Sequence, residues 1–318
     1  MEFDKSTVSL VINRVTDSLV AMKDDFISWP DNQRKNAILA RFYDKAGFPN
    51  VVGSIDGTHI RITGPSIDEP AFVNRKGFRS TNVQAICDHE GQINYGTTFS
   101  TFVTIIFLFK GRFTNISARW PGSAHDSHVF RTSAIGQHLE NVYQGIGQGV
   151  LLGDSGYPCR QFLLTPYRQP AAGRGQARFN RRHCLTRSTI ERTFGIWKKR
   201  FHILGSEIRM KPDKACRIII ACGILHNIAI MRNEPEVAEE QLIDNQPQMP
   251  PCNGPQDGKG IRDHFCLINC MFLFFHIFIN CLSLKKMRKF ENSNKSLYDQ
   301  FDNVLREEVC IFATSILV

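Results

Sequence analysis

The chain has 318 residues, of which 42% are hydrophobic and 22% are charged. These values are typical of a globular protein, and they exclude a chain that is disordered throughout, a collagen-like repeat and a polytopic membrane protein. Ten cysteines without any Cys-x-x-Cys pair, behind a polar N-terminus, favour a reducing compartment and argue against a zinc ribbon. The net charge of +9 favours an anionic partner.

The positive charge is concentrated between Arg168 and Arg200. This segment holds ten Lys or Arg residues and the single acid Glu191, so its net charge of +9 equals the excess of the whole chain. A short basic run is usually a solvated helix face, but ten cations interleaved with aromatic side chains favour a surface that binds DNA phosphates. We expect five of these cations to contact DNA. They are Arg181, Arg182, Lys198, Lys199 and Arg200.

The first part of the chain predicts helices and then strands. Apolar residues recur at helical spacing over 6–20, and a second helix is predicted to begin at Asp31 and to end at Gly47. The following run, VVGSIDGTHIRI, is rich in β-branched residues and predicts a strand. Two further strands are predicted over 81–89 and 112–120, and we expect them to pair as a hairpin.

The second part of the chain predicts a buried strand and two long helices. The apolar run GVLLGD ends at Asp154 and is typical of a parallel strand that is buried on both faces. Apolar residues three and four apart predict a helix from Arg187, on which Glu191 lies about 100° from the buried stripe. A last helix follows Asp213, and its His226 is predicted to be a core histidine. The proline-rich residues 233–260 predict a disordered linker.

Two apolar segments interrupt this pattern. Residues 97–109 lie between two predicted strands that would otherwise form a short hairpin, so we interpret 92–111 as an insertion. Residues 265–282 carry no formal charge and reach the minimum length of a membrane span, but three of them are polar and costly in lipid. The dominant residues of both segments have codons with T at the second position, which is typical of a translated intron end. We expect no stable membrane association.

Three acids stand where a solvated acid is not expected. Asp56 lies within a strand, Asp154 ends an apolar strand, and Glu191 lies on a helix beside a buried stripe. Each alone is typical of a cap or a turn, but this order of two strand aspartates and a helix glutamate is one that phosphodiester chemistry uses. Clustered carboxylates repel one another, so such a site must hold cations. Oxygen ligands favour Mg²⁺ or Mn²⁺, and two ions about 4 Å apart would activate the attacking oxygen and stabilise the leaving one.

Six motifs covering residues 49–228 resemble the PIF/Harbinger DDE transposases and the nucleases derived from them. The motifs are DGTHIRI from Asp56, FVNRKGFRSTNVQAICD from Phe72, WPGSAHDS from Trp120, LLGDSGYP from Leu151, IERTFGIWKKRF from Ile190 and ILHNI from Ile224. By this resemblance Asp56, Asp154 and Glu191 are the catalytic acids that bind the metal ions. Asp126 matches a further acidic position of the family and is expected near the site.

The resemblance implies an α/β fold, a ribonuclease H-like mixed sheet flanked by helices, with a short N-terminal helical part at 1–48. The nuclease domain is expected at 49–232, and 233–318 is expected to hold the linker and an unmatched C-terminal tail. Family members usually have more residues before the first strand, so a truncated start is possible here. They also lack the residues of 92–111, which agrees with an insertion there.

The function implied is a metal-dependent DNA endonuclease that hydrolyses phosphodiester bonds, located in the nucleus or, without a partner, in the cytoplasm. Related transposons rely on a separate Myb-like protein for DNA binding, so such a partner is implied. The main alternative is a catalytically silent DNA-binding or assembly protein domesticated from a transposase. A serine protease is disfavoured, because Tyr157 replaces the second glycine of GDSGGP and no matching histidine motif exists. Neither the target sequence nor the oligomeric state follows from the sequence.

Overall fold

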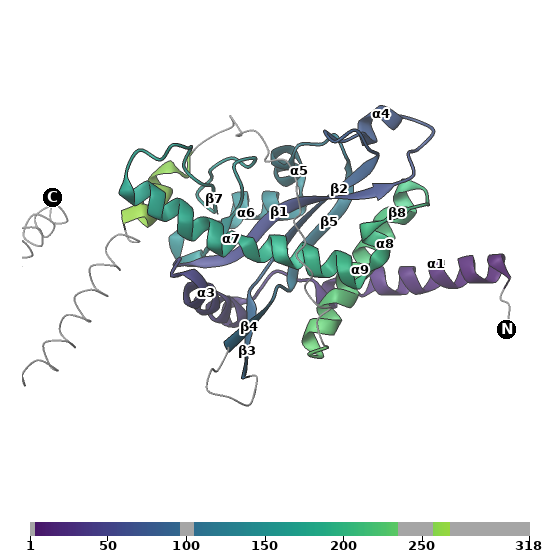
Figure 1. Ribbon diagram of the computed structural model, residues 1–318, viewed down its shortest axis with the longest axis horizontal. Coiled ribbons are helices and arrows are strands. Elements are labelled where there is room, and N and C mark those ends of the chain that lie inside the picture. The colour runs from purple at the N-terminus through teal and green to yellow at the C-terminus, as the bar shows by residue number, and fades with distance from the viewer. Residues whose placement is uncertain (1–3, 96–104, 235–256, 268–318) are drawn as a thin grey trace, which may run out of the picture. The chain divides into compact units, whose positions relative to one another are not determined.

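The strands pair into one mixed sheet in the computed structural model, which describes residues 4–95, 105–234 and 257–267 (Figure 1). In spatial order the strands are β5 (Phe113–Pro121), β2 (Ser80–Cys87), β1 (Val51–Ile62), β6 (Val150–Leu152) and β7 (Leu163–Leu164). β2 is antiparallel to both of its neighbours, whereas β1, β6 and β7 are parallel to one another. The short β8 (Glu207–Ile208) pairs with the end of β1. The predicted ribonuclease H-like mixed sheet is therefore confirmed.

Helices cover both faces of this sheet, and β2 is accordingly buried along its whole length. Val83, Ala85 and Cys87 pack in one core cluster with α7 and α9, whereas Ile86 packs in another with α5 and α6. Successive side chains of a strand point to opposite faces, so two helical layers are needed to cover it. The longer helices are α1 (Lys5–Ala21), α3 (Asn32–Ala46), α5 (Asp126–Thr132), α6 (Ala134–Val142), α7 (Arg174–Arg200) and α9 (Pro212–Met231). The single-turn ones are α2 (Lys23–Phe26), α4 (Glu69–Phe72), α8 (His202–Gly205) and the 3₁₀ turn η1 (Ile146–Gln148).

The ends of α3 lie where the sequence predicts them. The Asp31 side chain accepts a hydrogen bond from the backbone N–H of Arg34 at 2.8 Å, and Gly47 ends the helix in the left-handed region with φ of 65°. Ile38 and Phe42 are buried in the same core cluster as Phe48 and the start of β1. The N-terminal helical part therefore packs on the nuclease core without a break at residue 48.

The helix α7 begins 13 residues before the predicted start, at Arg174 in place of Arg187. The hydrophobic pattern of its first half does not reveal which face is buried, because that face includes polar residues. The buried His183 ring bonds the carbonyl oxygen of Leu164 at 3.1 Å, and Phe179 packs beside it. At the other end of the domain, His226 on α9 is also a core histidine, as predicted, and its Nε2 bonds the Gly111 carbonyl at 3.0 Å.

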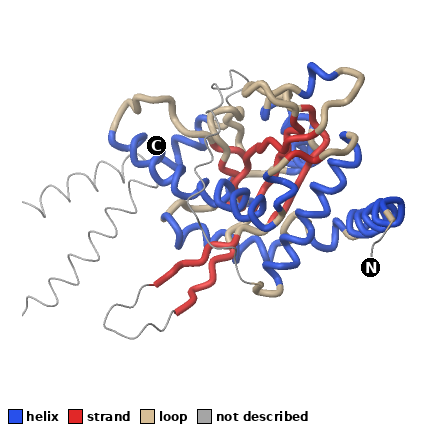
Figure 2. The backbone as a smooth tube through the Cα atoms, turned by 45° about the vertical axis from the view of Figure 1, so that its right-hand side comes forward, coloured by secondary structure: helices blue, strands red, loops and turns tan. Residues whose placement is uncertain are grey.

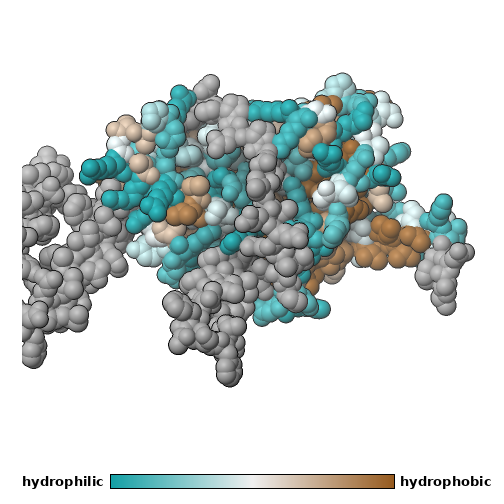
Figure 3. Space-filling model, viewed as in Figure 1, coloured by the Kyte–Doolittle hydropathy of each residue, from teal (hydrophilic) through white to brown (hydrophobic). Residues whose placement is uncertain are grey.

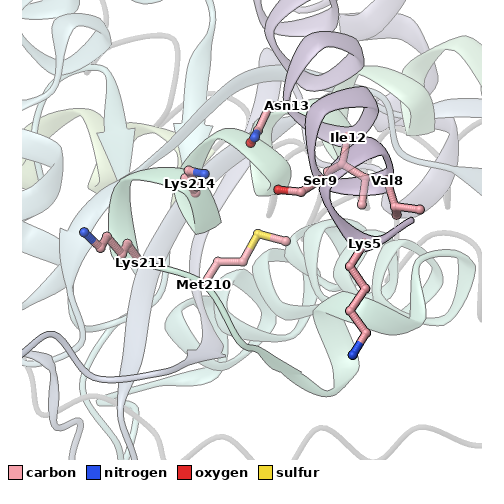
Figure 4. Close-up of a pocket in the computed structure, with 8 residues that line it drawn as sticks. All are labelled: Lys5, Val8, Ser9, Ile12, Asn13, Met210, Lys211 and Lys214. Carbon is pink, nitrogen blue, oxygen red and sulfur yellow. The ribbon is translucent and has the colours of Figure 1, made fainter. Parts of the chain in front are cut away.

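The helix α1 carries an apolar stripe that the described residues leave half exposed, and Figure 3 shows it as a hydrophobic patch. A groove of about 530 Å³ lies between α1 and the start of α9. Its lining residues are Lys5, Val8, Ser9, Ile12, Asn13, Met210, Lys211 and Lys214 (Figure 4). No predicted site residue lines this groove. α9 is long and apolar enough to cross a membrane, but over half of its apolar window is buried within the domain, as in the core helix of a soluble fold.

The predicted insertion at 92–111 forms most of a separate ribbon. Strands β3 (Glu90–Tyr95) and β4 (Ile105–Lys110) pair only with each other and extend from the body of the domain (Figure 2). Residues 96–104 lie outside the described part of the chain. Beyond the ribbon, β2 and β5 pair in antiparallel register, as the hairpin prediction requires. The ribbon therefore lengthens the hairpin and leaves the pairing of the main sheet in place, and whether it is an insertion stays a prediction.

The described part of the predicted linker and tail is ordered. Arg262 lies over the Tyr167 ring at 4.2 Å, and Tyr167 donates a hydrogen bond of 2.5 Å to Asp263. Phe265 is completely buried and stacks on Phe48 with ring centroids 5.7 Å apart. The prediction of disorder is wrong for residues 257–260, since a helix over 259–267 begins there. The segment is ordered because apolar side chains beyond the proline-rich stretch pack against the core. Residues 235–256 and 268–318, including most of the apolar segment 265–282, lie outside the described residues.

Replacing Phe265 with Ala tests whether this segment contributes to the fold. We expect a loss of about 3 kcal/mol of unfolding free energy, the low end for a buried Phe→Ala, because the segment can detach instead of leaving a cavity. Leu267 in the same segment is 62% exposed and serves as the control. Leu267→Ala should change stability by less than about 0.5 kcal/mol in urea unfolding. Equal effects of the two changes would show that the segment does not dock in solution.

Candidate active site

Two of the predicted acids are brought together by the pairing of β1 with β6. These strands are parallel, and Ser54 lies opposite Leu152. Asp56 and Asp154 each follow two residues later, so they reach the same level of the sheet. This level lies just beyond the carboxyl end of β6, whereas β1 continues to Ile62. Ligand sites of α/β sheets form beyond the carboxyl ends of parallel strands. The register alone therefore places two carboxylates side by side.

The third aspartate, Asp126, is the first residue of α5 and is 5% exposed. Asn82 on β2 donates a hydrogen bond of 2.8 Å to its Oδ1 and so fixes the carboxylate beside β1. Gly57, the neighbour of Asp56, is required here because a Cβ at that position would collide with the Asp126 carboxylate. The Asp126 carboxylate therefore lies beside Asp56, and its role in the site stays a prediction.

The fourth acid, Glu191, reaches the site from α7, where Arg187 lies one turn before it. The Arg187 guanidinium donates to Asp56 Oδ2 at 2.8 Å and also to Glu191 Oε1. The Arg187 side chain is 16% exposed and Glu191 is 48% exposed, so the ion pair joins a buried acid to one at the rim. Sequence reasoning counted Arg187 only among the basic run. The spacing of four residues to Glu191 puts both side chains on one helix face and could have revealed the pair.

Burial raises the pKa values of the three aspartates. The pKa of Asp56 is raised to about 8, because burial and the negative charges of Asp154 and Asp126 outweigh the attraction of Arg187. The pKa of Asp126 is raised to about 6 by burial and by Asp154, against the hydrogen bond from Asn82. Burial also raises the pKa of Asp154. Clustered groups with raised pKa values are typical of a functional site.

A hydrogen-bond network that starts from β2 supports the aspartates. Gln84 on β2 donates to the Tyr157 hydroxyl at 3.0 Å and to the backbone oxygen of Asp126 at 3.3 Å. Tyr157 is buried, and the charges of the three aspartates raise its pKa further above the value that burial alone would give. Sequence reasoning missed Asn82, Gln84 and Tyr157 as site residues. A buried strand that carries Asn and Gln at alternating positions was the available signal, since such amides need partners.

The donor set fits a divalent cation by its chemistry. Carboxylate oxygens are hard ligands, and the buried Oδ1 of Asn82 beside Asp126 has no hydrogen-bond partner, which leaves one further acceptor. Among the described residues, however, no group of three or more His, Cys, Asp or Glu side chains is arranged to hold a metal ion. Arg187 binds both Asp56 and Glu191. The carboxylate donors therefore fit a cation by their chemistry, but the described side chains are not arranged around one in this structure.

Comparison with known proteins agrees with this geometry. The family described as DDE superfamily endonuclease matches residues 93–227, a range that includes Asp126, Asp154 and Glu191. The cattle protein HARBI1, named as a candidate nuclease, is 32% identical over 230 residues, which are 71% of this chain and 59% of the relative. The chain belongs to the Harbinger transposase-derived family of DDE nucleases.

Plant relatives share the same region. The Arabidopsis thaliana protein named ALP1-like is 30% identical over 260 residues, 77% of this chain and 57% of the relative. A second one, named antagonist of like heterochromatin protein 1, is 29% identical over 239 residues, 71% of this chain and 55% of the relative. No solved structure gives a significant match. The chain spans less than two thirds of the length of these Harbinger-derived relatives.

The basic residues of this DDE protein do not share one face of α7. Arg181 and Lys199 lie with Arg174 and Arg192 on what we call the outer face of α7, because steps of 7, 11 and 7 residues return to one side of a helix with about 100° per residue. Lys198 lies on the side of Glu191, and its Nζ is 3.5 Å from the backbone oxygen of His59. Arg182 and Arg200 lie on the opposite edge, and Arg182 donates to the Gly47 carbonyl at 3.3 Å. The five predicted DNA contacts are therefore spread over three sides of the helix.

The raised pKa values make metal-free stability depend on pH. A buried carboxyl whose folded pKa lies above its unfolded value of about 3.9 contributes stability at low pH, and this contribution is lost as pH rises through the folded pKa. The metal-free protein should therefore lose stability from about pH 4 upward, through about 6 for Asp126 and about 8 for Asp56. Asp126→Asn removes one buried charge and keeps the acceptor that Asn82 needs.

We expect the free energy of unfolding of Asp126→Asn to exceed that of the parent at pH 8 by an amount on the order of 1 kcal/mol. The variant should lose this advantage at pH 4.5. Urea unfolding in the presence of EDTA measures both values. An advantage that is the same at the two pH values would contradict a raised pKa at Asp126.

Proposed function

We propose that the protein is a divalent-metal-dependent DNA endonuclease that hydrolyses phosphodiester bonds. The observation that carries this proposal is the matched register of β1 and β6, which sets Asp56 beside Asp154 where Asp126 and Glu191 also converge. Membership of the DDE family supports the same reaction. The chain covers only part of the length of its relatives, so the activity of a whole family protein is proposed for this chain.

Each acid has a separate role in this proposal. Asp56 and Asp154 supply oxygen ligands from rigid strands, and Glu191 closes the site from the rim. Asp126 adds negative charge that Asn82 holds in place. Two bound Mg²⁺ or Mn²⁺ ions would activate the attacking water and stabilise the leaving oxygen. The burial of the aspartates strengthens their attraction for cations, since charges interact more strongly away from bulk water.

Replacing single acids tests this proposal. Asp154→Asn and Glu191→Gln should each lower Mg²⁺-dependent nicking of supercoiled DNA by more than about 100-fold, because each removes a ligand charge and little volume. Glu207→Gln is the matched control, since Glu207 is an exposed carboxylate on β8. It should nick DNA like the parent, and all variants should keep the parent melting temperature within a few degrees. Parent-like nicking by either site variant would show that these acids are not catalytic.

We further propose that DNA reaches the acids along the outer face of α7. Arg174, Arg181 and Arg192 are exposed there, and Lys199 is half buried. The helix has 27 residues and spans about 40 Å at about 1.5 Å per residue, which is long enough to follow a duplex past Glu191. Phosphate contacts of this kind position DNA without reading its bases.

Salt dependence tests this path. Changing Arg181, Arg192 and Lys199 together to Ala should flatten the log-log salt slope of duplex binding by up to about 2.7, at about 0.9 per lost phosphate contact. The matched control changes Lys5, Lys211 and Lys214 to Ala in the groove at α1, which removes the same charge elsewhere. If the control flattens the slope as much as the α7 variant, net charge and not a DNA path explains the binding.

A catalytically silent role in DNA binding or assembly is the second candidate function. The bond from Arg187 to both Asp56 and Glu191 favours it, because it neutralises the site without a cation. The name of one plant relative refers to heterochromatin protein, which points to a role through protein partners for that relative. A parent protein that binds DNA and lacks Mg²⁺-dependent nicking would support the silent role.

The remaining proposals concern the cellular location of the protein and its partners. A DNA substrate implies action in the nucleus, and a chain without its partner would stay in the cytoplasm. A separate Myb-like protein would then supply sequence recognition, as the resemblance to the transposon family implies. Fluorescent fusion of the chain, alone and with such a protein, tests both points.

A further inference from the structure

The Arg187 side chain occupies the space between the strand acids and the helix acid. One of its nitrogens bonds Asp56, a second bonds Glu191, and its charge offsets part of the rise that burial causes in the pKa of Asp154. A guanidinium is planar and carries its donors in a fixed fork, so it can bind two carboxylates at once. Among the described residues, Arg75 also acts to lower the pKa of Asp126, and His125 acts to lower that of Asp154.

These contacts engage the carboxylate oxygens that a shared cation would need. The bonded atoms are Oδ2 of Asp56 and Oε1 of Glu191. A cation shared by both acids would stand between the strand and the helix, where the guanidinium now lies. Two positive groups cannot share this space, because they repel one another and compete for the same oxygens.

We propose that Arg187 is a built-in counter-ion of the metal-free site, which holds the acids together and competes with the divalent cation for them. This inference rests on the proposed function, since it takes the cation to bind these acids. Without the cation, Arg187 offsets the repulsion among the carboxylates and keeps Glu191 near the strands. Loading of the cation then requires Arg187 to release at least one acid. Glu191 is the one free to move, because its side chain is half exposed.

This role differs from that of a residue that merely prepares the metal site. If Arg187 held the acids in the geometry that the cation needs, removing it would weaken cation binding. If Arg187 is a competitor, removing it tightens cation binding and at the same time destabilises the metal-free protein. The two effects have opposite signs, so a single variant separates the two roles.

The experiment compares the full chain with Arg187→Met, which keeps most of the side-chain stem and removes the charge. Calorimetric titration with Mn²⁺ at pH 8 should show at least about tenfold tighter binding in the variant, because one positive charge a few ångströms from a divalent ion is removed. In EDTA the variant should melt roughly 3–6 °C below the parent, because buried carboxylates lose their counter-ion. Arg187→Lys keeps the charge but not the fork, and it should fall between the two proteins in both measurements.

Arg217→Met is the matched control, because Arg217 on α9 also loses an ion pair, with Asp17, away from the acids. Its Mn²⁺ affinity should stay within about twofold of the parent. Equal or weaker Mn²⁺ binding by Arg187→Met would overturn the inference and leave the proposed function intact. A parent chain that binds no Mn²⁺ at millimolar concentration would instead overturn the metal-dependent function, and the competition with it.

Discussion

Repulsion among buried carboxylates is the constraint on which this domain depends. Asp154 raises the pKa values of Asp56 and Asp126, Asp126 raises that of Asp56, and burial removes most of the water that would screen these charges. A fold that gained only stability from this region would place apolar side chains there. The domain instead holds the acids with a paired guanidinium, an Asn side chain and a glycine that leaves room. Each of these devices acts against the same electrostatic cost.

The sheet stays folded despite this electrostatic repulsion because its other positions are strongly apolar. β2 is buried on both faces, and three core clusters join it and its neighbours to helices on either side. Trp197 and Phe113 are completely buried and pack edge to face, with ring centroids 5.3 Å apart. Burial of this kind contributes roughly 25 cal/mol for each Å² of apolar surface removed from water. The acids therefore stand on a rigid scaffold, at the level where β6 ends beside the middle of β1.

Much of the fold could be predicted because local patterns were strong. β1 spans Val51–Ile62, the run that its β-branched residues indicated, and α3 begins and ends at its predicted cap residues. The start of α7 was missed, since its buried face carries His183 and Thr186, and polar residues do not show a stripe. Arg187 was missed for another reason. Within a dense basic run, composition does not show which cation turns inward, and only the position of β1 beside the helix decides it.

The ribbon at 90–110 bears on whether the acids keep their places. At its base, Arg34 pairs with the buried Asp88 at 2.6 Å, and the backbone of Arg112 donates to the same carboxylate at 3.0 Å. Asn227 on α9 then bonds both the N–H and the carbonyl of Phe113, at 2.8 and 2.7 Å. These bonds fix the first residues after the ribbon, so its length is not transmitted to β2. β2 carries Asn82 and Gln84 beside the acids and pairs with β1 without a register shift, so the ribbon leaves these two residues in register with β1. Among the described residues, the charges around Asp56 and Glu191, and not the length of the ribbon, therefore act directly on the acids.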